Sequence, residues 1–283
     1  MLDEVRSIVR RALEEDLPDS TSDSIFDPDG RSSARIVAKA SGVLAGLPFA
    51  SVAFDEVDPD SILEPRVADG DRITPGDIVA IVRGQTRALL AAERTALNLL
   101  QRASGIATET RRYVDAVAGT GAMILDTRKT APGLRVLDKY AVRIGGGQNH
   151  RMSLHDMAMI KNNHVDGAGS ITTAIDRVRR ANPDLAIMVE VRDLDELREA
   201  IGAGSRLILL DNMTIKELES AVSLARELAP AEGVLALEAS GGITLNNVRE
   251  VAETGVDRIS IGALTHSVTA LDISMRIDSG DDR

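Results

Sequence analysis

The stretch LAIMVEVRDLDELREAIGAGSRLILLDN, residues 185–212, holds two apolar runs on either side of an amphipathic segment. The runs at 185–191 and 206–210 are rich in Ile, Leu and Val, as buried strands are. Between them, Asp193 is placed to cap a helix, with Glu196 three residues further on as in a capping box. The stretch therefore predicts a strand–helix–strand unit with parallel strands.

Similar units extend along the chain from about residue 108 onward. Apolar strand candidates lie near 122–126, 157–160, 185–191, 206–210, 234–238 and 257–261, and most of them are followed by a helical pattern. Thr214 and Glu217 have the spacing of a second capping box. Six or more such units indicate a barrel or a doubly wound sheet. We favour the barrel, because polar residues follow many of these strands and the carboxyl ends of barrel strands meet at one mouth.

The first part of the chain has a different pattern. Residues 2–13 have helical spacing, and 86–105 predict a long helix rich in Ala and Leu, with Gly105 near its end. Between them, 34–54 and 70–84 are β-prone runs that Gly, Pro and Asp turns divide into short strands. We expect a small α+β unit here.

The composition argues against several classes of protein. The formal net charge is −11 and aromatic residues make up 2% of the 283 residues, which disfavours nucleic-acid and anionic-membrane partners. There is no cysteine, so disulfides and thiolate zinc sites are ruled out. Residues 1–16 are charged and amphipathic, unlike a signal peptide, and no apolar run approaches the roughly 20 residues that span a bilayer. We expect a cytoplasmic protein with no membrane or nucleic-acid partner.

Cations gather in one window of this acidic chain. Residues 126–164 contain seven Lys or Arg and only three acids, together with three of the four histidines. A generic solvated face does not explain this inversion of charge. A zinc site is the weaker alternative, because the histidine spacing matches no standard ligand set. We therefore predict a site for a ligand with several negative charges.

The cations in this window suit different parts of such a ligand. Arg128 and Arg151 can each present a planar fork to a carboxylate. Lys129 and Lys161 are point charges that suit a phosphate or the second oxygen of a carboxylate. Two interpretations of His150 stay open here: a donor to the anion, or a structural hydrogen bond in its loop.

Two carboxylates end neighbouring predicted strands. Glu190 closes one apolar run and Asp211 closes the next, so both should face the same mouth. Mg²⁺ usually takes one or two carboxylates together with substrate phosphate oxygens, and we predict a magnesium position here. The alternative is an ion pair between one of these acids and Lys161 or Lys129.

Small residues end the last two predicted strands. Ser240, Gly241 and Gly242 follow one strand, and Gly262 and Ala263 follow the other. Barrels often bind a phosphate through backbone N–H groups in these two loops, and glycine lets the backbone come close. Together with the basic half and the pair of acids, the loops predict transfer of a phosphorylated sugar onto an acidic small molecule.

A set of motifs resembles one family over nearly the whole chain. They are ERTALNLLQRASGIAT (93–108), DTRKTAPGLRVLDKYAVRIGGGQNHRMSLHD (126–156), IKNNH (160–164), LLDN (209–212), SGGI (240–243) and GVDRISIGALTHS (255–267). The chain resembles the quinolinate phosphoribosyltransferase family, the carboxylating nicotinate-nucleotide pyrophosphorylases of NAD biosynthesis.

The resemblance implies an α/β fold of two domains. One is an N-terminal α/β sandwich domain at 1–107, with 270–283 packed back on it. The other is an open, seven-stranded, TIM-like α/β barrel at 108–269 that carries out the catalysis. The resemblance also implies a homodimer in which the sandwich domain of one subunit caps the barrel of the other.

The resemblance further implies roles for the quinolinate half of the site. By this resemblance, the substrate carboxylates are bound by Arg128, His150, Arg151 and Lys161. Arg94 matches an arginine that the family supplies to the partner's site. Each of these roles is an expectation of the resemblance.

For phosphoribosyl diphosphate, the resemblance places Lys129 near the reacting centre and Glu190 and Asp211 near the ribose hydroxyls and Mg²⁺. The loops at 240–242 and 262–263 match the cup for the 5-phosphate. The implied catalytic set is Lys129, Lys161, Glu190 and Asp211. The implied enzyme is a pentosyltransferase that joins quinolinate to phosphoribosyl and releases pyrophosphate and CO₂, leaving nicotinate mononucleotide.

Two positions depart from the family's pattern. Met188 stands where the family often has Glu, and Asn162 where it usually has Asp, which puts helper roles at both in doubt. The nearest alternative function is a phosphoribosyltransferase that acts on nicotinate or a related acid without decarboxylation. An aldolase that uses Lys161 as a Schiff base is a further alternative, which the flanking cations disfavour. A scaffold without activity leaves the charges at the strand ends unexplained.

Overall fold

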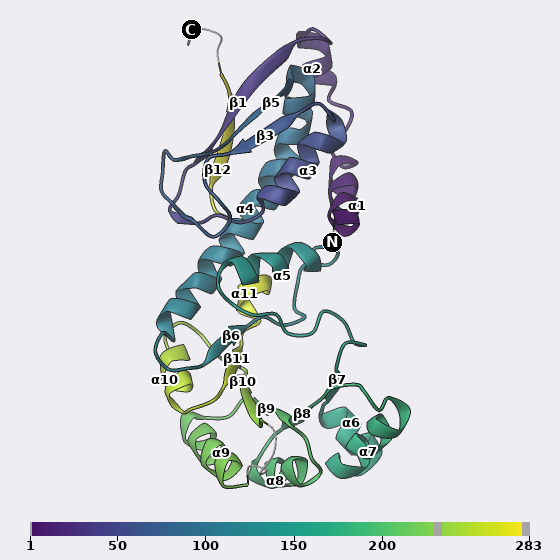
Figure 1. Ribbon diagram of the computed structural model, residues 1–283, viewed down its shortest axis with the longest axis vertical. Helices are drawn as coiled ribbons and strands as arrows, with labels where there is room; N and C mark the ends of the chain where they lie inside the picture. Colours follow the sequence, from purple (N-terminus) through teal and green to yellow (C-terminus); the bar gives the residue numbers. More distant parts are fainter. Residues whose placement is uncertain (1, 229–233, 279–283) are drawn as a thin grey trace. The chain divides into compact units, whose positions relative to one another are not determined.

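The protein is described by a computed structural model that covers residues 2–228 and 234–278 (Figure 1). It divides into two compact units. Unit 1 comprises Met1–Arg111, Thr130–Gly146 and Ala263–Arg283, and unit 2 comprises Arg112–Lys129 and Gly147–Gly262. In the part of the chain that is described, no helix is long and apolar enough to cross a membrane.

Unit 2 is built on a parallel sheet with the strand order β6-β11-β10-β9-β8-β7. Its strands are β6 (Met123–Leu125), β7 (Ala158–Ile160), β8 (Ile187–Val191), β9 (Leu207–Asp211), β10 (Ala236–Ser240) and β11 (Arg258–Ser260). Neighbours in the sequence are neighbours in the sheet from β7 to β11, and β6 lies beside β11. This is the order of a barrel that is open between β6 and β7. The α/β class and the six predicted strand positions are confirmed.

The expected seventh strand is reduced to a single bridge among the described residues. Gln148 pairs with Leu125 in parallel: its N–H donates to Ile124 O at 2.8 Å, and its carbonyl accepts from Asp126 N–H at 3.1 Å. Gly146 just before it has a φ of +93°, which turns the chain away from an extended path. Pairing therefore stops at one residue, beside the end of β6.

Helices lie on the outer side of this sheet (Figure 1). They are α6 (Asn162–Ala168), α7 (Ile171–Ala181), α8 (Leu194–Gly202), α9 (Ile215–Glu227) and α10 (Val248–Glu253). The capping box predicted for α9 is confirmed, because Thr214 and Glu217 each bond the backbone of the other. Asp193 caps α8 as predicted, but Glu196 accepts from the backbone N–H of Arg192 instead of Asp193.

The two faces of the sheet differ in chemistry. On β10, Leu237 and Ala239 are 0% and 1% exposed, on the face that the helices cover. Glu238 alternates with them and points to the interior. The register aligns Glu238 with Leu209 of β9 and Arg258 of β11, and Leu209 in turn with Glu190 of β8. Because aligned residues of a parallel sheet point to the same side, charged side chains from three strands line the interior.

Unit 1 contains an antiparallel sheet with the order β12-β1-β5-β3. Its strands are β1 (Arg31–Ala38), β3 (Ile62–Pro65), β5 (Ile78–Gln85) and β12 (Ile273–Ile277), and a separate pair is formed by β2 (Gly42–Val43) and β4 (Arg72–Ile73). The helices are α1 (Leu2–Leu13), α2 (Ser20–Ile25), α3 (Leu47–Val57), α4 (Thr86–Ala116), α5 (Arg135–Ile144) and α11 (Ala263–His266). The predicted helix over 2–13 is confirmed by α1.

Helix α3 lies where the sequence indicated strands, within 34–54, so that prediction is wrong for this segment. Pro48 stands in the first turn, where a proline needs no N–H partner and fits the helix. Phe49, Ala53 and Phe54 are buried, and their spacing places them on one helical face. Helical spacing of the large apolar residues therefore outweighs the β-prone composition.

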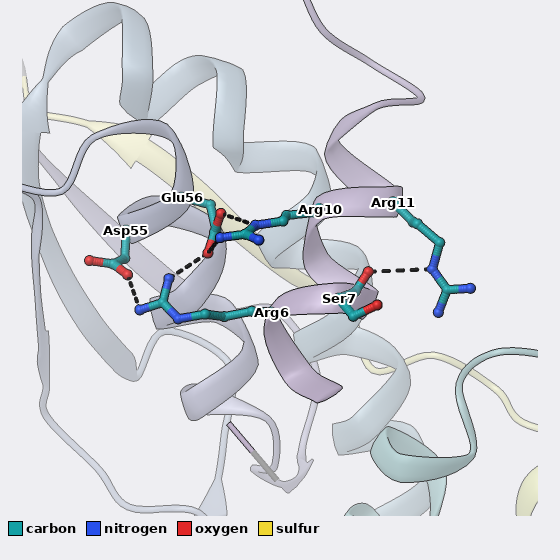
Figure 2. Close-up of polar contacts among 6 residues, drawn as sticks. All are labelled: Arg6, Ser7, Arg10, Arg11, Asp55 and Glu56. Atoms are coloured by element: carbon teal, nitrogen blue, oxygen red, sulfur yellow. Dashed lines mark hydrogen bonds and ion pairs between the residues drawn. The ribbon is translucent and has the colours of Figure 1, made fainter. Parts of the chain in front are cut away.

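Ion pairs fasten α1 to α3 (Figure 2). Arg6 donates to Asp55 at 2.6 Å and also to Glu56, and Arg10 donates to Glu56 at 2.6 Å. The two arginines lie one helical turn apart, so both reach the same carboxylate. Hydrogen bonds from Arg10 and then from Arg6 hold the pKa of the Glu56 carboxyl below its ordinary value.

Helix α4 continues past the end expected from the sequence. The pattern over 86–105 predicted an end near Gly105, but the helix runs to Ala116. A Cβ atom at Gly105 would lie 2.2 Å from the carbonyl oxygen of Thr269. The glycine therefore permits close packing of another segment and does not end the helix.

The segment Thr130–Gly146 groups with unit 1, whereas the limits expected from the sequence place it in the second domain. Side chains of α5 explain the grouping. Tyr140 Oη donates to Asp69 Oδ2 at 2.6 Å, and the guanidinium of Arg102 on α4 donates to buried Asp138 at 2.8 Å.

Candidate active site

Buried Asp126 organises the chain just after β6. Its side chain is 0% exposed. Oδ1 accepts a hydrogen bond from the backbone N–H of His150 at 2.8 Å, and Oδ2 accepts from Asn149 Nδ2 at 2.6 Å. Asp126 therefore holds the segment that contains His150 and Arg151 against the end of β6, which brings the two parts of the basic window together.

Arg128 and Lys129 lie beyond the end of the strand. β6 ends at Leu125, and Thr127 Oγ1 accepts from the backbone N–H of Lys129 at 3.0 Å to form a turn. The two cations are thus free of the alternation that would send them to opposite faces of a strand. Arg128 is half-buried with its Nε fully covered, whereas Lys129 is exposed.

The charge of Arg128 acts on Arg151. Burial first, and then repulsion from Arg128, lowers the pKa of Arg151 below its ordinary value. Nη1 of Arg151 donates to the carbonyl oxygen of Met157 at 2.7 Å, which fixes the side chain. Two cations held together in a partly buried place are stabilised when an anion binds between them. The arrangement suits a ligand with more than one carboxylate.

His150 is buried, and each of its ring nitrogens faces a polar group of another residue. Nδ1 accepts a hydrogen bond from the backbone N–H of Arg151 at 2.8 Å, so the proton of the neutral ring belongs on Nε2. Nε2 lies 3.5 Å from Oε1 of Glu238. The bond at Nδ1 is the structural hydrogen bond that one of the two interpretations of His150 predicted. The other side of the ring, Nε2–H, can donate to a ligand.

Lys161 and Glu190 form an ion pair at the ends of β7 and β8. Nζ lies 2.5 Å from Oε2, with the lysine side chain 48% exposed and the glutamate side chain 8% exposed. The sequence left open whether one of the two acids binds magnesium or forms an ion pair with a lysine. The structure shows the ion pair for Glu190. The backbone N–H of Lys161 also donates to His164 Nδ1 at 2.9 Å, which gives His164 a role in starting α6.

Asp211 is fixed by the residue that follows it. Its Oδ2 accepts from Asn212 Nδ2 at 3.0 Å. Asn212 has a φ of +54°, and its backbone N–H donates to Ser240 O at 2.8 Å. A Cβ at Gly241 would lie 2.1 Å from Oδ1 of Asn212, so a larger residue would displace that side chain and strain a backbone whose φ is +96°. Asn212 thus connects the carboxylate of Asp211, at the end of β9, to the loop after β10 through two hydrogen bonds.

The loop after β10 contains two successive glycines in left-handed backbone conformations. Gly241 and Gly242 have φ values of +96° and +62°. Within residues 2–228 and 234–278, their N–H groups make no hydrogen bond. A pocket of about 210 Å³ lies beside the loop, lined in part by Ser240, Thr214 and Asn247. Free N–H groups of successive residues suit a phosphate.

Two family models match the chain, one after the other. "Quinolinate phosphoribosyl transferase, N-terminal domain" matches residues 19–104, and "Quinolinate phosphoribosyl transferase, C-terminal domain" matches residues 106–276. The chain belongs to the quinolinate phosphoribosyltransferase family.

Proteins similar to this member of the family come from several bacteria. The nicotinate-nucleotide pyrophosphorylase [carboxylating] of Mycobacterium leprae is 46% identical over 279 residues, which cover 96% of this chain and 97% of the relative. A probable enzyme of the same name from Synechocystis is 46% identical and covers 87% of this chain and 83% of its own length. The crystal structure of NadC from Streptococcus pyogenes has a TM-score of 0.92 and 38% identity, with 98% of each chain covered.

Magnesium stays a prediction for this quinolinate phosphoribosyltransferase family member, with Glu190 and Asp211 as its candidate ligands. Among the residues described, no group of three or more His, Cys, Asp or Glu side chains is placed to hold a metal ion. Glu190 and Asp211 stand at the ends of neighbouring strands β8 and β9. Mg²⁺ takes one or two carboxylates and completes its shell with waters and phosphate oxygens. These two side chains would hold it, with Glu190 released from Lys161.

Not all of the predicted site residues come from unit 2. Arg94 is exposed on α4 in unit 1, and in the described part of the chain it makes no hydrogen bond or ion pair. Ala263 begins α11 in unit 1, and Gly262 is the last residue of unit 2. The binding roles assigned to these and the other site residues stay predictions.

Three polar residues of the site have no role predicted from the sequence: Asp126, Asn212 and Glu238. Asp126 is the last residue of one predicted strand and Asn212 lies just after another, and neither has a role of its own in the motifs. Glu238 left a clearer signal, because it is a lone acid between Leu237 and Ala239 in a strand expected to be buried. An acid at such a position needs a reason, since Glu is rarely buried without a partner.

Proposed function

We propose that this chain transfers the phosphoribosyl group of phosphoribosyl diphosphate to quinolinate and removes the 2-carboxylate, which yields nicotinate mononucleotide, CO₂ and pyrophosphate. The names of the relatives from M. leprae and Synechocystis support the reaction. One observation carries the proposal in this chain: the side chain of Arg151 is fixed on Met157 O at 2.7 Å, in a partly buried place where the charge of Arg128 lowers its pKa. Quinolinate carries two adjacent carboxylates at neutral pH, and this charge would balance the pair.

The basic half of the site recognises the substrate as a dicarboxylate. Arg128 and Arg151 offer forks, Lys161 a point charge, and His150 the donor at Nε2. A hydrogen bond to a charged group contributes roughly 1.5–3 kcal/mol. Nicotinate has one carboxylate, so it would leave one of the guanidinium groups without an anion. This difference selects quinolinate.

The transfer step needs positive charge near the leaving group and firm positioning of the ribose. The ring nitrogen of quinolinate attacks C1 of the ribose while the bond from C1 to pyrophosphate breaks. Exposed Lys129 is available to the diphosphate, and Asp211, held by Asn212, is available to a ribose hydroxyl. Mg²⁺, when bound, supplies charge that neutralises the leaving diphosphate. Loss of one well-aimed donor of this kind typically costs roughly 2.7–4 kcal/mol of transition-state stabilisation.

Decarboxylation follows from the product of that step. The new bond from C1 leaves the ring nitrogen positively charged. The bond between C2 and its carboxylate breaks, CO₂ leaves, and the electron pair stays on C2 beside that charge until a proton adds there. No side-chain nucleophile takes part. The pairing of Lys161 with Glu190 disfavours the alternative of an aldolase that uses this lysine as a Schiff base.

A direct comparison of two acids tests the proposal. The protein is incubated with phosphoribosyl diphosphate, Mg²⁺ and either quinolinate or nicotinate, and the mononucleotides are separated by chromatography. We expect nicotinate mononucleotide from quinolinate, at a kcat/KM roughly 10- to 150-fold above that for nicotinate, as expected from one lost charge-assisted contact. A preference for nicotinate, or a mononucleotide that keeps both carboxylates, would support the alternative function.

We also propose that the enzyme is a homodimer in which Arg94 completes the partner's site. The exposed position of Arg94 on α4, without a hydrogen bond or ion pair among the described residues, supports this role. Arg94→Ala and Lys161→Ala should each be inactive alone, and a mixture that exchanges subunits should regain activity. Absence of recovery, with exchange verified by differently tagged subunits, would argue against a shared site.

We place the reaction in the cytoplasm. Both substrates carry several negative charges, and such molecules do not cross a bilayer unaided. A fusion of the chain to a fluorescent protein in its own host should be distributed through the cytoplasm, and a signal confined to another compartment would contradict this.

A further inference from the structure

Glu238 is a buried acid with no role in the reaction as proposed above. It lies in the middle of β10 with 1% of its side chain exposed. Among the described residues, neither of its carboxylate oxygens makes a hydrogen bond of ordinary geometry. A carboxylate buried in this way is unfavourable, because it loses its hydration without full compensation.

Residues of strands β11 and β9 and of the end of β6 lie around Glu238. Arg258 is its register partner on β11, and Ser260 lies two residues further along that strand. Asp126 stands at the end of β6, and on the other side the register partner is the apolar Leu209 of β9. Burial raises the pKa of Glu238 to about 7; Ser260 and Arg258 lower it, and the charge of Asp126 raises it.

His150 connects this acid to the quinolinate half of the site. Its Nε2 lies 3.5 Å from Oε1 of Glu238, and its Nδ1 is engaged by the backbone N–H of Arg151. A second proton on the ring would have to displace that hydrogen bond. With Nδ1 engaged in this way, the hydrogen of a neutral ring lies on Nε2, which faces the buried carboxyl group of Glu238.

We propose that Glu238 is a positioning residue that acts through His150 and that takes up a proton when quinolinate binds. In its neutral form, Glu238 leaves the Nε2–H of His150 to the substrate carboxylate. In its ionised form, Glu238 accepts a hydrogen bond from that Nε2–H group. It also adds a negative charge to a site that must hold a dianion. The inference rests on the proposed function, because it names the ligand of the same site.

The pH dependence of the KM for quinolinate tests the proposal. In the full-length enzyme at saturating phosphoribosyl diphosphate, KM should rise between pH 6.5 and 8.5, by up to about 25-fold if the proton on Glu238 is essential. In Glu238→Gln, which has no proton to lose, KM should change little over the same range. Glu238→Asp keeps a titrating acid and should keep the rise, and kcat should change less than KM throughout.

A matched control and a second measurement separate this role from a structural one. Glu253→Gln makes the same chemical change at an exposed acid of α10 that pairs with Arg249, and it should keep the wild-type profile. Calorimetry with quinolinate in two buffers of different ionisation enthalpy should show proton uptake near pH 7.5 by the wild type, and less by Glu238→Gln. The wild-type measurement stands even if the glutamine variant folds poorly.

The outcomes distinguish this inference from the function on which it rests. An active enzyme whose KM is independent of pH, or a Glu238→Gln variant with the wild-type slope, overturns the role of Glu238 alone. A wild type that takes up no proton when quinolinate binds also overturns the role of Glu238 alone. A wild type that neither binds nor turns over quinolinate overturns the proposed function and this inference with it.

Discussion

The ion pair between Lys161 and Glu190 can be broken from either side, and the two sides should not be equivalent. Lys161→Met leaves the carboxylate of Glu190, whose side chain is 8% exposed, without its cation. Glu190→Gln leaves Lys161, whose side chain is 48% exposed and can regain water. We therefore expect the lysine variant to lose more stability than the glutamine variant.

The structure sets the size of the effect. Removing one partner of a fully buried pair typically costs roughly 3–5 kcal/mol, whereas exposed pairs contribute about 1 kcal/mol or less. With one partner buried and the other half-exposed at 2.5 Å, the pair lies between these limits. We expect Lys161→Met to lower the free energy of unfolding by about 2 kcal/mol, and Glu190→Gln by less than about 1 kcal/mol.

The double variant isolates the interaction between the two side chains. Urea unfolding of the wild type, both single variants and the double variant should give a coupling energy of about 1–2 kcal/mol. Lys216→Met and Glu219→Gln make the same changes at exposed positions of α9 and should alter stability by less than about 0.5 kcal/mol. Additive single variants, or a Lys161→Met protein as stable as Lys216→Met, would refute the reasoning.

Other residues of the site give further predictions. Arg128→Ala should raise the KM for quinolinate roughly 10- to 150-fold and change the KM for phosphoribosyl diphosphate little, because a contact with a charged carboxylate contributes roughly 1.5–3 kcal/mol; an equal rise in both would contradict its assignment. Asn212→Ala and Asn212→Gly should both weaken binding of phosphoribosyl diphosphate, since each loses the hydrogen bond to Asp211, but only the alanine should melt at lower temperature at a φ of +54°. Equal melting of the two would count against this. For Glu238, the raised pKa means that the folded state holds a proton that the unfolded state has lost, so the wild type should lose about 1–3 kcal/mol of stability relative to Glu238→Gln between pH 5 and 8; parallel unfolding curves would exclude this.

The strands of unit 2 could be predicted because their signal is local. Each apolar run is short, ends in polar residues and is followed by a helical pattern, and the six observed strands lie at the six predicted positions. Element boundaries that depend on distant residues were missed. Gly105 looked like a helix end, but its reason is the close approach of Thr269, which lies far away in the sequence. The strand expected in place of α3 failed because composition was given more weight than spacing.

The site could be predicted as a collection of charges but not as a network. Strand ends and the excess of cations indicate Arg128, Arg151 and Lys161 as candidates, and their binding roles stay predictions. The choice between a metal ligand and an ion pair for Glu190 depends on a distance of 2.5 Å to Lys161, which no sequence pattern contains. The direction of the His150 ring likewise depends on a hydrogen bond from the next residue and on an acid from β10.

The fate of the 2-carboxylate is the property that separates this reaction from every alternative considered. Quinolinate labelled with radioactive carbon in that carboxylate is incubated with the enzyme, phosphoribosyl diphosphate and Mg²⁺, and CO₂ and mononucleotide are counted together. A dicarboxylate site that drives decarboxylation should release one labelled CO₂ for each nicotinate mononucleotide formed. Label that stays in the mononucleotide, or no product at all, would show that Arg128 and Arg151 serve another ligand.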